Sequence, residues 1–245
     1  MSWTVIIPVK RLDVAKTRLR QALDAADLEE LVLAMAVDVT AAALASPVIG
    51  RVVVVTADPA AASAIGAVGA DLVVDVPDAG LNPALAYAAG IVRPAGAAAT
   101  LPGVAALAAD LPALRVEDLT DALRAAQAAN ADGRTGTDVT YATARRAFVA
   151  DSSGTGTVLL AAPPGVRLEP CFGGASAAAH VASGAVELDG NWPGLRRDVD
   201  TAADLAEAVV LGVGPRTSSA LTRMPRPPVA IAPDGAPGPG RPATV

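Results

Sequence analysis

The sequence predicts an α/β fold, a single three-layer domain with a mostly parallel (mixed) sheet. Short β-branched runs alternate with alanine-rich stretches of helical length through most of the chain, and this alternation is typical of strand–helix–strand units. Aromatic residues make up only 2% of the 245 residues, so the core must be built from Val, Leu and Ala. Such a core suits helices packed on a parallel sheet.

The strands and helices of the first half alternate along the chain. Four apolar runs are predicted as buried strands: Thr4–Ile7, Arg51–Thr56, Asp71–Val76 and Val104–Ala109. The stretches that follow them are predicted as helices: Asp27–Ala45, Ala60–Val68, Asn82–Ile91 and Val116–Ala129. This order predicts right-handed crossovers between parallel strands.

The pattern changes between residues 138 and 188, where shorter elements are expected. The strands would be Thr157–Ala161 and Val166–Glu169, and a helix would span Ala175–Ser183. A segment of this kind predicts either an antiparallel edge of the sheet or a lobe that covers it.

The chain is expected to form one domain, residues 1–214, followed by a tail. Near the end of the domain, Thr201 is a natural N-cap with Asp204 three residues later, which is an acidic capping box. Residues 215–245 are rich in Pro, Gly and Ala and predict a disordered tail.

Charge and cysteine content limit the class of function. The net charge of −6 argues against a nucleic-acid partner but leaves a phosphorylated small molecule open. Cys171 is the sole cysteine, so neither a disulfide framework nor a zinc cluster is expected. No signal peptide or membrane-spanning stretch is visible, which predicts a cytoplasmic protein without a membrane partner.

A basic loop follows the first strand. It spans Pro8–Lys16 and contains three cations, Lys10, Arg11 and Lys16. Ligands of open α/β sheets bind beyond the carboxyl ends of the strands, so these cations could meet a polyphosphate. The alternative is a solvated loop before a helix. Neither GxxxxGK[ST] nor GxGxxG is present, which argues against a P-loop and a dinucleotide fingerprint.

Three carboxylates lie at the end of a predicted strand or in an extended segment just before a predicted helix. Asp110 comes directly after the fourth strand, while Asp198 and Asp200 lie two residues apart and would share one face of an extended segment. Mg²⁺ usually takes one or two carboxylates together with phosphate oxygens and water. The alternative roles are a turn at Asp110 and a helix start at Asp200.

Two glycine-rich turns could bind an anion. GTGT ends at Thr157, and FGGAS contains Gly173 and Ser176 at a predicted helix N-terminus. Ordinary loops are the alternative. His180 lies on the same helix face as Ser176, and a lone helical histidine is more often structural than catalytic.

The order of these motifs resembles one family. IPVK, KTRL, GLNPAL, ADLPAL, GTGT, FGGAS and DVDTAADL occur in the order found in the phosphoenolpyruvate or 2-phospho-L-lactate guanylyltransferases of coenzyme F(420) biosynthesis. The resemblance covers about Thr4 to Gly214, and FVADSSGTGTVLLAA and WPGLRRDVDTAADL are its most specific strings. It implies the nucleotidyltransferase (GT-A-like, Rossmann-like) fold.

The resemblance also implies a role for each motif. GTP would bind through the basic loop and the start of the third helix: Pro8, Lys10, Arg11, Lys16, Gly80 and Asn82. The acid would bind at Thr157, Gly173 and Ser176. Mg²⁺ would be held by Asp110 and by Asp198 or Asp200, and the catalytic residues would be Lys16, Asp110 and Asp200.

The implied reaction joins GMP from GTP to the acid and releases pyrophosphate. The phosphate monoester is already an anionic nucleophile, so no general base is needed. We favour phosphoenolpyruvate over 2-phospho-L-lactate because the chain resembles the alanine-rich bacterial members. The enzyme that follows in the pathway is a possible partner. Alternatives are a nucleotidyltransferase using CTP or a sugar phosphate, a D-x-D glycosyltransferase, and a nucleotide-binding module without activity.

Overall fold

A mixed sheet forms the centre of the chain in the computed structural model, which describes residues 2–12, 19, 23–93, 101–129 and 144–225. Within these residues the sheet has seven strands in the order β3-β2-β1-β4-β6-β5-β7. The strands are β1 (Trp3–Val9), β2 (Ile49–Thr56), β3 (Asp71–Val74), β4 (Gly103–Leu107), β5 (Ala147–Ala150), β6 (Thr157–Ala162) and β7 (Val186–Glu187). The predicted α/β class with a mostly parallel mixed sheet is confirmed.

Helices follow most of the strands. Those of the first half are α1 (Ala25–Ala45), α2 (Pro59–Gly66), α3 (Leu81–Val92) and α4 (Val116–Ala128). Those of the second half are α5 (Ser176–Ala182), α6 (Pro193–Arg196), α7 (Ala202–Leu211) and α8 (Pro215–Arg223). The predicted capping box is present at α7, where Thr201 accepts from the backbone N–H of Asp204 and the Asp204 carboxylate accepts in return.

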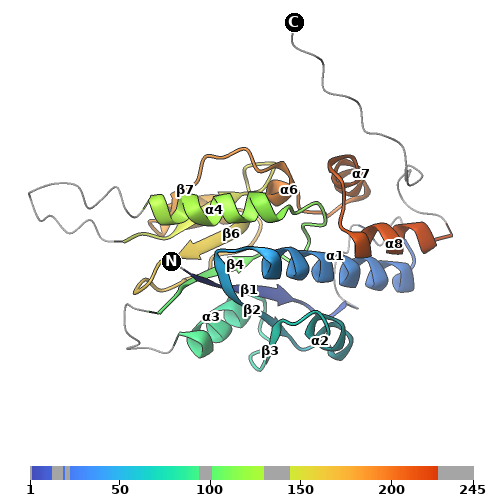
Figure 1. The fold of residues 1–245 in the computed structure, drawn as a ribbon, viewed down its shortest axis with the longest axis horizontal. Coiled ribbons are helices and arrows are strands. Elements are labelled where there is room, and N and C mark those ends of the chain that lie inside the picture. Colours follow the sequence, from blue (N-terminus) through green and yellow to red (C-terminus); the bar gives the residue numbers. More distant parts are fainter. Residues whose placement is uncertain (1, 13–18, 20–22, 94–100, 130–143, 226–245) are drawn as a thin grey trace, which may run out of the picture.

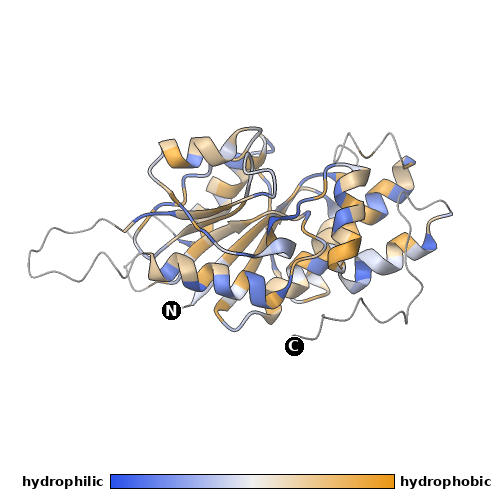
Figure 2. Cartoon of the chain, turned by 90° about the horizontal axis from the view of Figure 1, so that it is seen from above, coloured by the Kyte–Doolittle hydropathy of each residue, from blue (hydrophilic) through white to orange (hydrophobic). Residues whose placement is uncertain are grey.

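The helices cover both faces of the sheet. The core on one face includes Val37 of α1 and Leu123 of α4, whereas the core on the other face includes Leu85 of α3 and Ala177 of α5. Figure 1 shows α1 and α4 on one side of the strands and α3 on the other. Coloured by hydropathy, the central strands are apolar along much of their length (Figure 2). Because the central strands are buried on both faces, their sequences are continuous apolar runs and do not alternate between apolar and polar residues.

One strand runs against the rest of the described sheet. β1 pairs in parallel with β2 and β4, but β6 is antiparallel to both β4 and β5. The first residue of β6, Thr157, therefore lies at the same edge of the sheet as the last residues of β1, β4 and β5. This edge collects the loops that carry the candidate site.

The segment expected to form an antiparallel edge supplies β6, β5 and the edge strand β7 on one side of the sheet, although its antiparallel strand, β6, lies between β4 and β5. Two other expectations from the sequence differ from the structure. Residues 166–169 form no strand, because the backbone there is held by arginine side chains instead of by a neighbouring strand.

The predicted start of the tail at residue 215 is also wrong. Residues 215–223 form α8, which lies beside α1 (Figure 1). Thr217, Ala220 and Leu221 of α8 are buried, so this helix belongs to the domain; residues 226–245 of the predicted tail lie outside the described residues. In the described part of the chain, no helix is both long and apolar enough for a bilayer crossing.

Candidate functional site

A cavity of about 990 Å³ opens at the edge of the sheet where β1, β4 and β5 end and β6 begins. Most of the residues predicted for the site line it: Pro8, Lys10, Asp110, Thr157, Gly173, Ser176, Asp198 and Asp200. Lys16 falls in residues 13–18, which lie outside the described residues. The predictions for the metal and acid sites thus converge on one place.

The carboxylates of Asp198 and Asp200 are held beside the end of β4. The backbone N–H of Val199, between them, donates to the carbonyl of Asp110 at 3.0 Å, and the Val199 side chain is fully buried. In an extended segment, neighbouring side chains alternate in direction. Because the Val199 side chain points into the core, the side chains of Asp198 and Asp200 point the opposite way, and both line the cavity together with Asp110.

Among the residues that the structure describes, no three His, Cys, Asp or Glu side chains are arranged as a ready metal centre. The aspartates nevertheless give the cavity an excess of carboxylates. Besides Asp110, Asp198 and Asp200, it is lined by Asp151 and Asp204, and the cations among its described lining residues are Lys10 and Arg197.

Asp58 positions the start of the basic loop. Its carboxylate accepts from the backbone N–H groups of Leu12 at 3.1 Å and of Ala60 and Ala61 in α2. Partial burial raises the pKa of Asp58, but these three N–H donors and the charge of Arg11 outweigh it, so the pKa lies below its usual value. The residue after Arg11 is thus tied to the start of α2, and Lys10 and Arg11, just before it, line the cavities described here.

A second cavity of about 230 Å³ adjoins the basic loop. It is lined by Pro8, Lys10, Arg11 and Gly80, all of which were predicted to bind the nucleotide. Gly80 precedes α3 with a φ of 107°, a left-handed conformation that favours glycine.

Asn82 was assigned to the nucleotide with these residues but does not line either of these two cavities. Its side-chain amide donates to the carbonyl of Phe172 at 2.9 Å and accepts from the N–H of Phe172 at 2.8 Å. Asn82 therefore holds the FGGAS turn, which the sequence gives no sign of.

The GTGT turn is ordered by Asp151, which sequence reasoning missed. One carboxylate oxygen of Asp151 accepts from the N–H of Thr155 at 3.0 Å, and the other accepts from that of Gly156 at 2.9 Å. These bonds fix the entry into β6 and hence the position of Thr157. The sequence does carry a signal for this role of Asp151. A carboxylate that directly follows a strand and stands four or five residues before a glycine-rich turn can accept from the backbone N–H groups of that turn.

The FGGAS turn differs from the predicted anion site at a helix N-terminus. The N–H of Ser176 donates to the carbonyl of Gly173, and the N–H of Ala177 donates to that of Thr155. These two N–H groups of α5 thus already have protein acceptors. Near Gly173 and Gly174, in contrast, an added Cβ would meet no atom within 4 Å, so the glycine backbone itself borders open space.

Arg197 is the second cavity residue that sequence reasoning missed. Its guanidinium pairs with Glu207 at 2.6 Å and with Asp204 at 3.8 Å, and it comes directly before Asp198. Because α7 supplies both partners, the capping box and the arginine together fix the segment that carries Asp198 and Asp200.

His180 is fully buried next to Thr157, which lines the cavity. Its Nδ1 lies 2.9 Å from the hydroxyl of Thr157, and its Nε2 accepts from the backbone N–H of Cys171 at 3.0 Å. Burial and the charge of Arg146 lower the pKa of His180 to about 4, against a small opposite effect from the backbone of Ser176. The imidazole is therefore neutral at physiological pH, in keeping with a structural role.

This depressed pKa predicts a pH window for stability. Between the unfolded value of 6.5 and the folded value of about 4, the unfolded chain binds more protons at His180 than the folded chain does. The contribution of His180 is therefore complete above 6.5 and is lost as the pH falls toward 4. Chemical unfolding of the wild type and of His180→Gln from pH 8 to 4 measures this contribution. The difference in free energy of unfolding between the two proteins should shrink as the pH falls through this window, and a constant difference would contradict the lowered pKa of His180.

Comparisons with known proteins show the family of the chain. Residues 3–180 match the family described as "Guanylyl transferase CofC like". A relative from Salinispora arenicola named phosphoenolpyruvate guanylyltransferase is 56% identical over 216 residues, which cover 88% of this chain and 92% of the relative. One of the same name from Geodermatophilus obscurus is 49% identical over 231 residues, covering 92% and 97%.

Solved structures are similar in fold. A nucleotidyl transferase from Methanothermobacter thermautotroptrophicus superposes with a TM-score of 0.54 at 17% identity, over 84% of this chain and 95% of that one. The chain thus has a nucleotidyltransferase-like α/β fold, and with the family match and the two relatives it belongs to the guanylyl transferase CofC-like family.

Proposed function

We propose that the chain joins GMP from GTP to phosphoenolpyruvate, forming enolpyruvyl-diphosphoguanosine and pyrophosphate, in coenzyme F(420) biosynthesis. The observation that carries the proposal is that Lys10, Asp110 and Asp200 line the same cavity as Thr157 and Ser176. The names of relatives up to 56% identical over most of both chains support the two substrates.

The chemistry needs positioning and charge neutralisation more than proton transfer. A phosphate oxygen of phosphoenolpyruvate attacks the α-phosphorus of GTP and forms the new P–O bond. The bond from the α-phosphorus to the bridging oxygen breaks, and that oxygen leaves with the electron pair as part of pyrophosphate. No proton must be removed from the nucleophile, which agrees with a neutral, fully buried His180.

Lys10 and Arg11 would face the triphosphate from the end of β1, where the smaller cavity with Gly80 adjoins the larger one. Lys16, which lies outside the described residues, would extend this basic side. Thr157, Gly173 and Ser176 would bind the acid at the opposite side, where β6 and α5 begin.

The carboxylates fit a divalent cation. A triphosphate entering a cavity lined by Asp110, Asp198 and Asp200 would be repelled unless a cation lay between the charges. Mg²⁺ is satisfied by one or two carboxylates plus phosphate oxygens and water, so Asp110 with Asp198 or Asp200 would suffice. When bound, Mg²⁺ supplies charge neutralisation on the triphosphate. We favour Asp200 as the second ligand because it stands just before α7.

The proposal is tested by pyrophosphate release from the purified chain. Each of the four nucleoside triphosphates is combined with phosphoenolpyruvate or with 2-phospho-L-lactate, with Mg²⁺ and with EDTA. A pyrophosphatase and the enzyme that consumes the product are added to draw off an unstable compound. We expect release only with GTP, phosphoenolpyruvate and Mg²⁺. Release with CTP would show that the proposed base is wrong, and a preference for 2-phospho-L-lactate would show that the proposed acid is wrong. Undiminished release in EDTA would show that the reaction needs no divalent cation.

A further inference from the structure

The segment from Pro163 to Gly174, here called the strap, connects β6 to α5 without regular secondary structure. Its last three residues, Phe172 to Gly174, line the main cavity. A strand or helix would satisfy the backbone groups of such a segment internally, whereas here side chains of other elements bind them. The position of the cavity lining therefore depends on these side chains.

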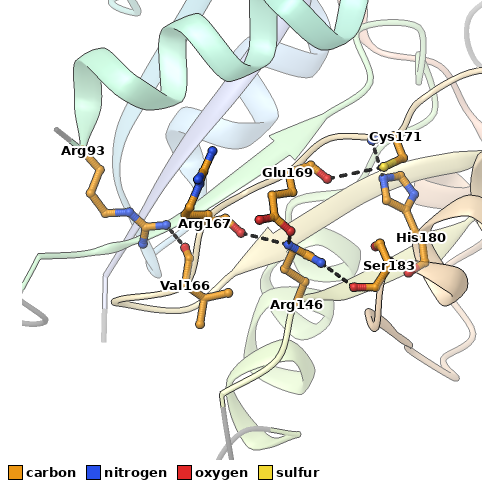
Figure 3. A network of polar contacts seen from close by, with 8 residues as sticks. All are labelled: Arg93, Arg146, Val166, Arg167, Glu169, Cys171, His180 and Ser183. Atoms are coloured by element: carbon orange, nitrogen blue, oxygen red, sulfur yellow. Dashed lines mark hydrogen bonds and ion pairs between the residues drawn. The ribbon is translucent and has the colours of Figure 1, made fainter. Parts of the chain in front are cut away.

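Two arginines bind the part of the strap before Cys171 (Figure 3), and residues 163–171 do not line the main cavity. Arg93, just after α3, donates to the carbonyls of Pro163 and Val166. Arg146, just before β5, pairs with Glu169 and donates to the carbonyl of Ser183 at 2.6 Å. These contacts fix the strap to the end of α3 and to the start of β5, and neither arginine lines the main cavity.

Two neutral side chains hold the near part of the strap at adjacent residues. His180 Nε2 accepts from the N–H of Cys171 (Figure 3), and the amide of Asn82 binds both backbone groups of Phe172. His180 comes from α5 and Asn82 from α3. The backbone that leads into Gly173 is thus clamped from two elements.

The contact to Cys171 also decides which nitrogen of His180 carries the proton. A backbone N–H can only donate, so Nε2 must be the unprotonated nitrogen of the neutral ring. The proton is then on Nδ1, and Nδ1 donates to the hydroxyl oxygen of Thr157 at 2.9 Å. Because the Thr157 oxygen accepts from Nδ1–H of His180, the hydroxyl proton of Thr157 is not used in this contact. It is therefore available for donation to an anionic oxygen in the cavity.

We propose that His180 is a positioning residue for the acidic substrate: its Nδ1–H tautomer makes Thr157 a hydrogen-bond donor and its Nε2 fixes the turn before Gly173. The substrate named here rests on the proposed function, but the tautomer and the two contacts do not. His180 itself would touch no substrate atom and would act through Thr157 and the strap.

Two variants separate the two contacts. The amide of His180→Asn can reach the position of Nδ1 and donate to Thr157, but it cannot reach Cys171. The amide oxygen of His180→Gln can reach the position of Nε2 and accept from Cys171, but Thr157 loses its donor. Val181→Ala, at a side chain that is 54% exposed on the same helix, is the matched control.

We expect both His180 variants to raise the KM for phosphoenolpyruvate about tenfold and to leave the KM for GTP within about twofold, with the control unchanged. A purely structural histidine would lower stability and reduce the active fraction without this split between the substrates. Equal changes in the two KM values, or an unaltered KM for phosphoenolpyruvate, would overturn the proposal.

A second measurement does not depend on turnover or on the folding of a variant. His180 is the only histidine of the chain, so nitrogen NMR of the ¹⁵N-labelled wild type reports one imidazole. We expect a protonated Nδ1 and an unprotonated Nε2, and a shift of these signals when phosphoenolpyruvate alone is titrated in. A protonated Nε2 would overturn the proposal whatever the enzyme does. If the expected tautomer is present but another acid shifts the signals, the positioning role stands and the proposed substrate fails.

Discussion

Replacement of Asp110 by asparagine is expected to reduce turnover by roughly 10²–10³-fold, the usual cost of losing one group that stabilises transition-state charge. Asparagine has the same size but no charge, so the loss reflects cation binding rather than packing. Asp110 lines the cavity after β4, and its backbone carbonyl, which the substitution leaves intact, keeps the contact to Val199. Steady-state pyrophosphate release at increasing Mg²⁺ concentrations measures the effect.

The matched control for Asp110→Asn is Asp121→Asn. Asp121 lies on α4 with a side chain that is 61% exposed, and it pairs with Arg124 outside the cavity. We expect wild-type turnover in the control and an unchanged melting temperature in both variants. Turnover of Asp110→Asn within about twofold of the wild type at saturating Mg²⁺ would show that this carboxylate does not take part.

Replacement of Asp38 by alanine is expected to lower the free energy of unfolding by about 3 kcal/mol, because two charge-assisted hydrogen bonds, one buried and one partly buried, are lost. Asp38 of α1 accepts from the N–H groups of Arg216 at 3.0 Å and Thr217 at 2.7 Å, which begin α8. Gly214 fits against it, since a Cβ there would lie 2.4 Å from the Asp38 carboxyl carbon. Chemical unfolding of the full chain measures the change.

Asp38→Asn serves as the graded control, because its one amide oxygen can still accept from one of the two N–H groups. We expect an intermediate loss for Asp38→Asn. Hydrogen exchange should show faster exchange in residues 215–223 of the alanine variant than in the wild type. If the alanine variant is as stable as the wild type, α8 does not contribute to the fold in the way described.

The sequence predicts the strands and helices of the first half well for a physical reason. In the run predicted at Arg51–Thr56, every residue after Arg51 is buried, and the helix after Asp200 carries a local capping box, so the signal is contained in neighbouring residues. The place of β6 inside the sheet and the packing of α8 depend on partners far along the chain. Asp38, for example, is 178 residues from Arg216, and no local pattern marks that contact.

The candidate site divides in the same way. Asp110 was found because it directly follows a strand, and Asp198 and Asp200 because of their spacing before a helix start; all three line the cavity. Asn82 was assigned to the nucleotide although it binds Phe172, 90 residues away, and the sequence showed no partners for His180. Side chains that act by holding a distant backbone have no motif of their own, and only the folded chain shows them.

The most direct test of the central claim is the fate of the phosphate oxygens. Phosphoenolpyruvate labelled with ¹⁸O in its phosphate oxygens is incubated with GTP, Mg²⁺ and the chain, and the products are analysed by phosphorus NMR and mass spectrometry. Attack by the acid on the α-phosphorus predicts a guanosine product with a coupled pair of phosphorus signals that retains all the label, and unlabelled pyrophosphate. Label in the pyrophosphate, or GMP or GDP in place of the joined product, would contradict the reaction proposed here.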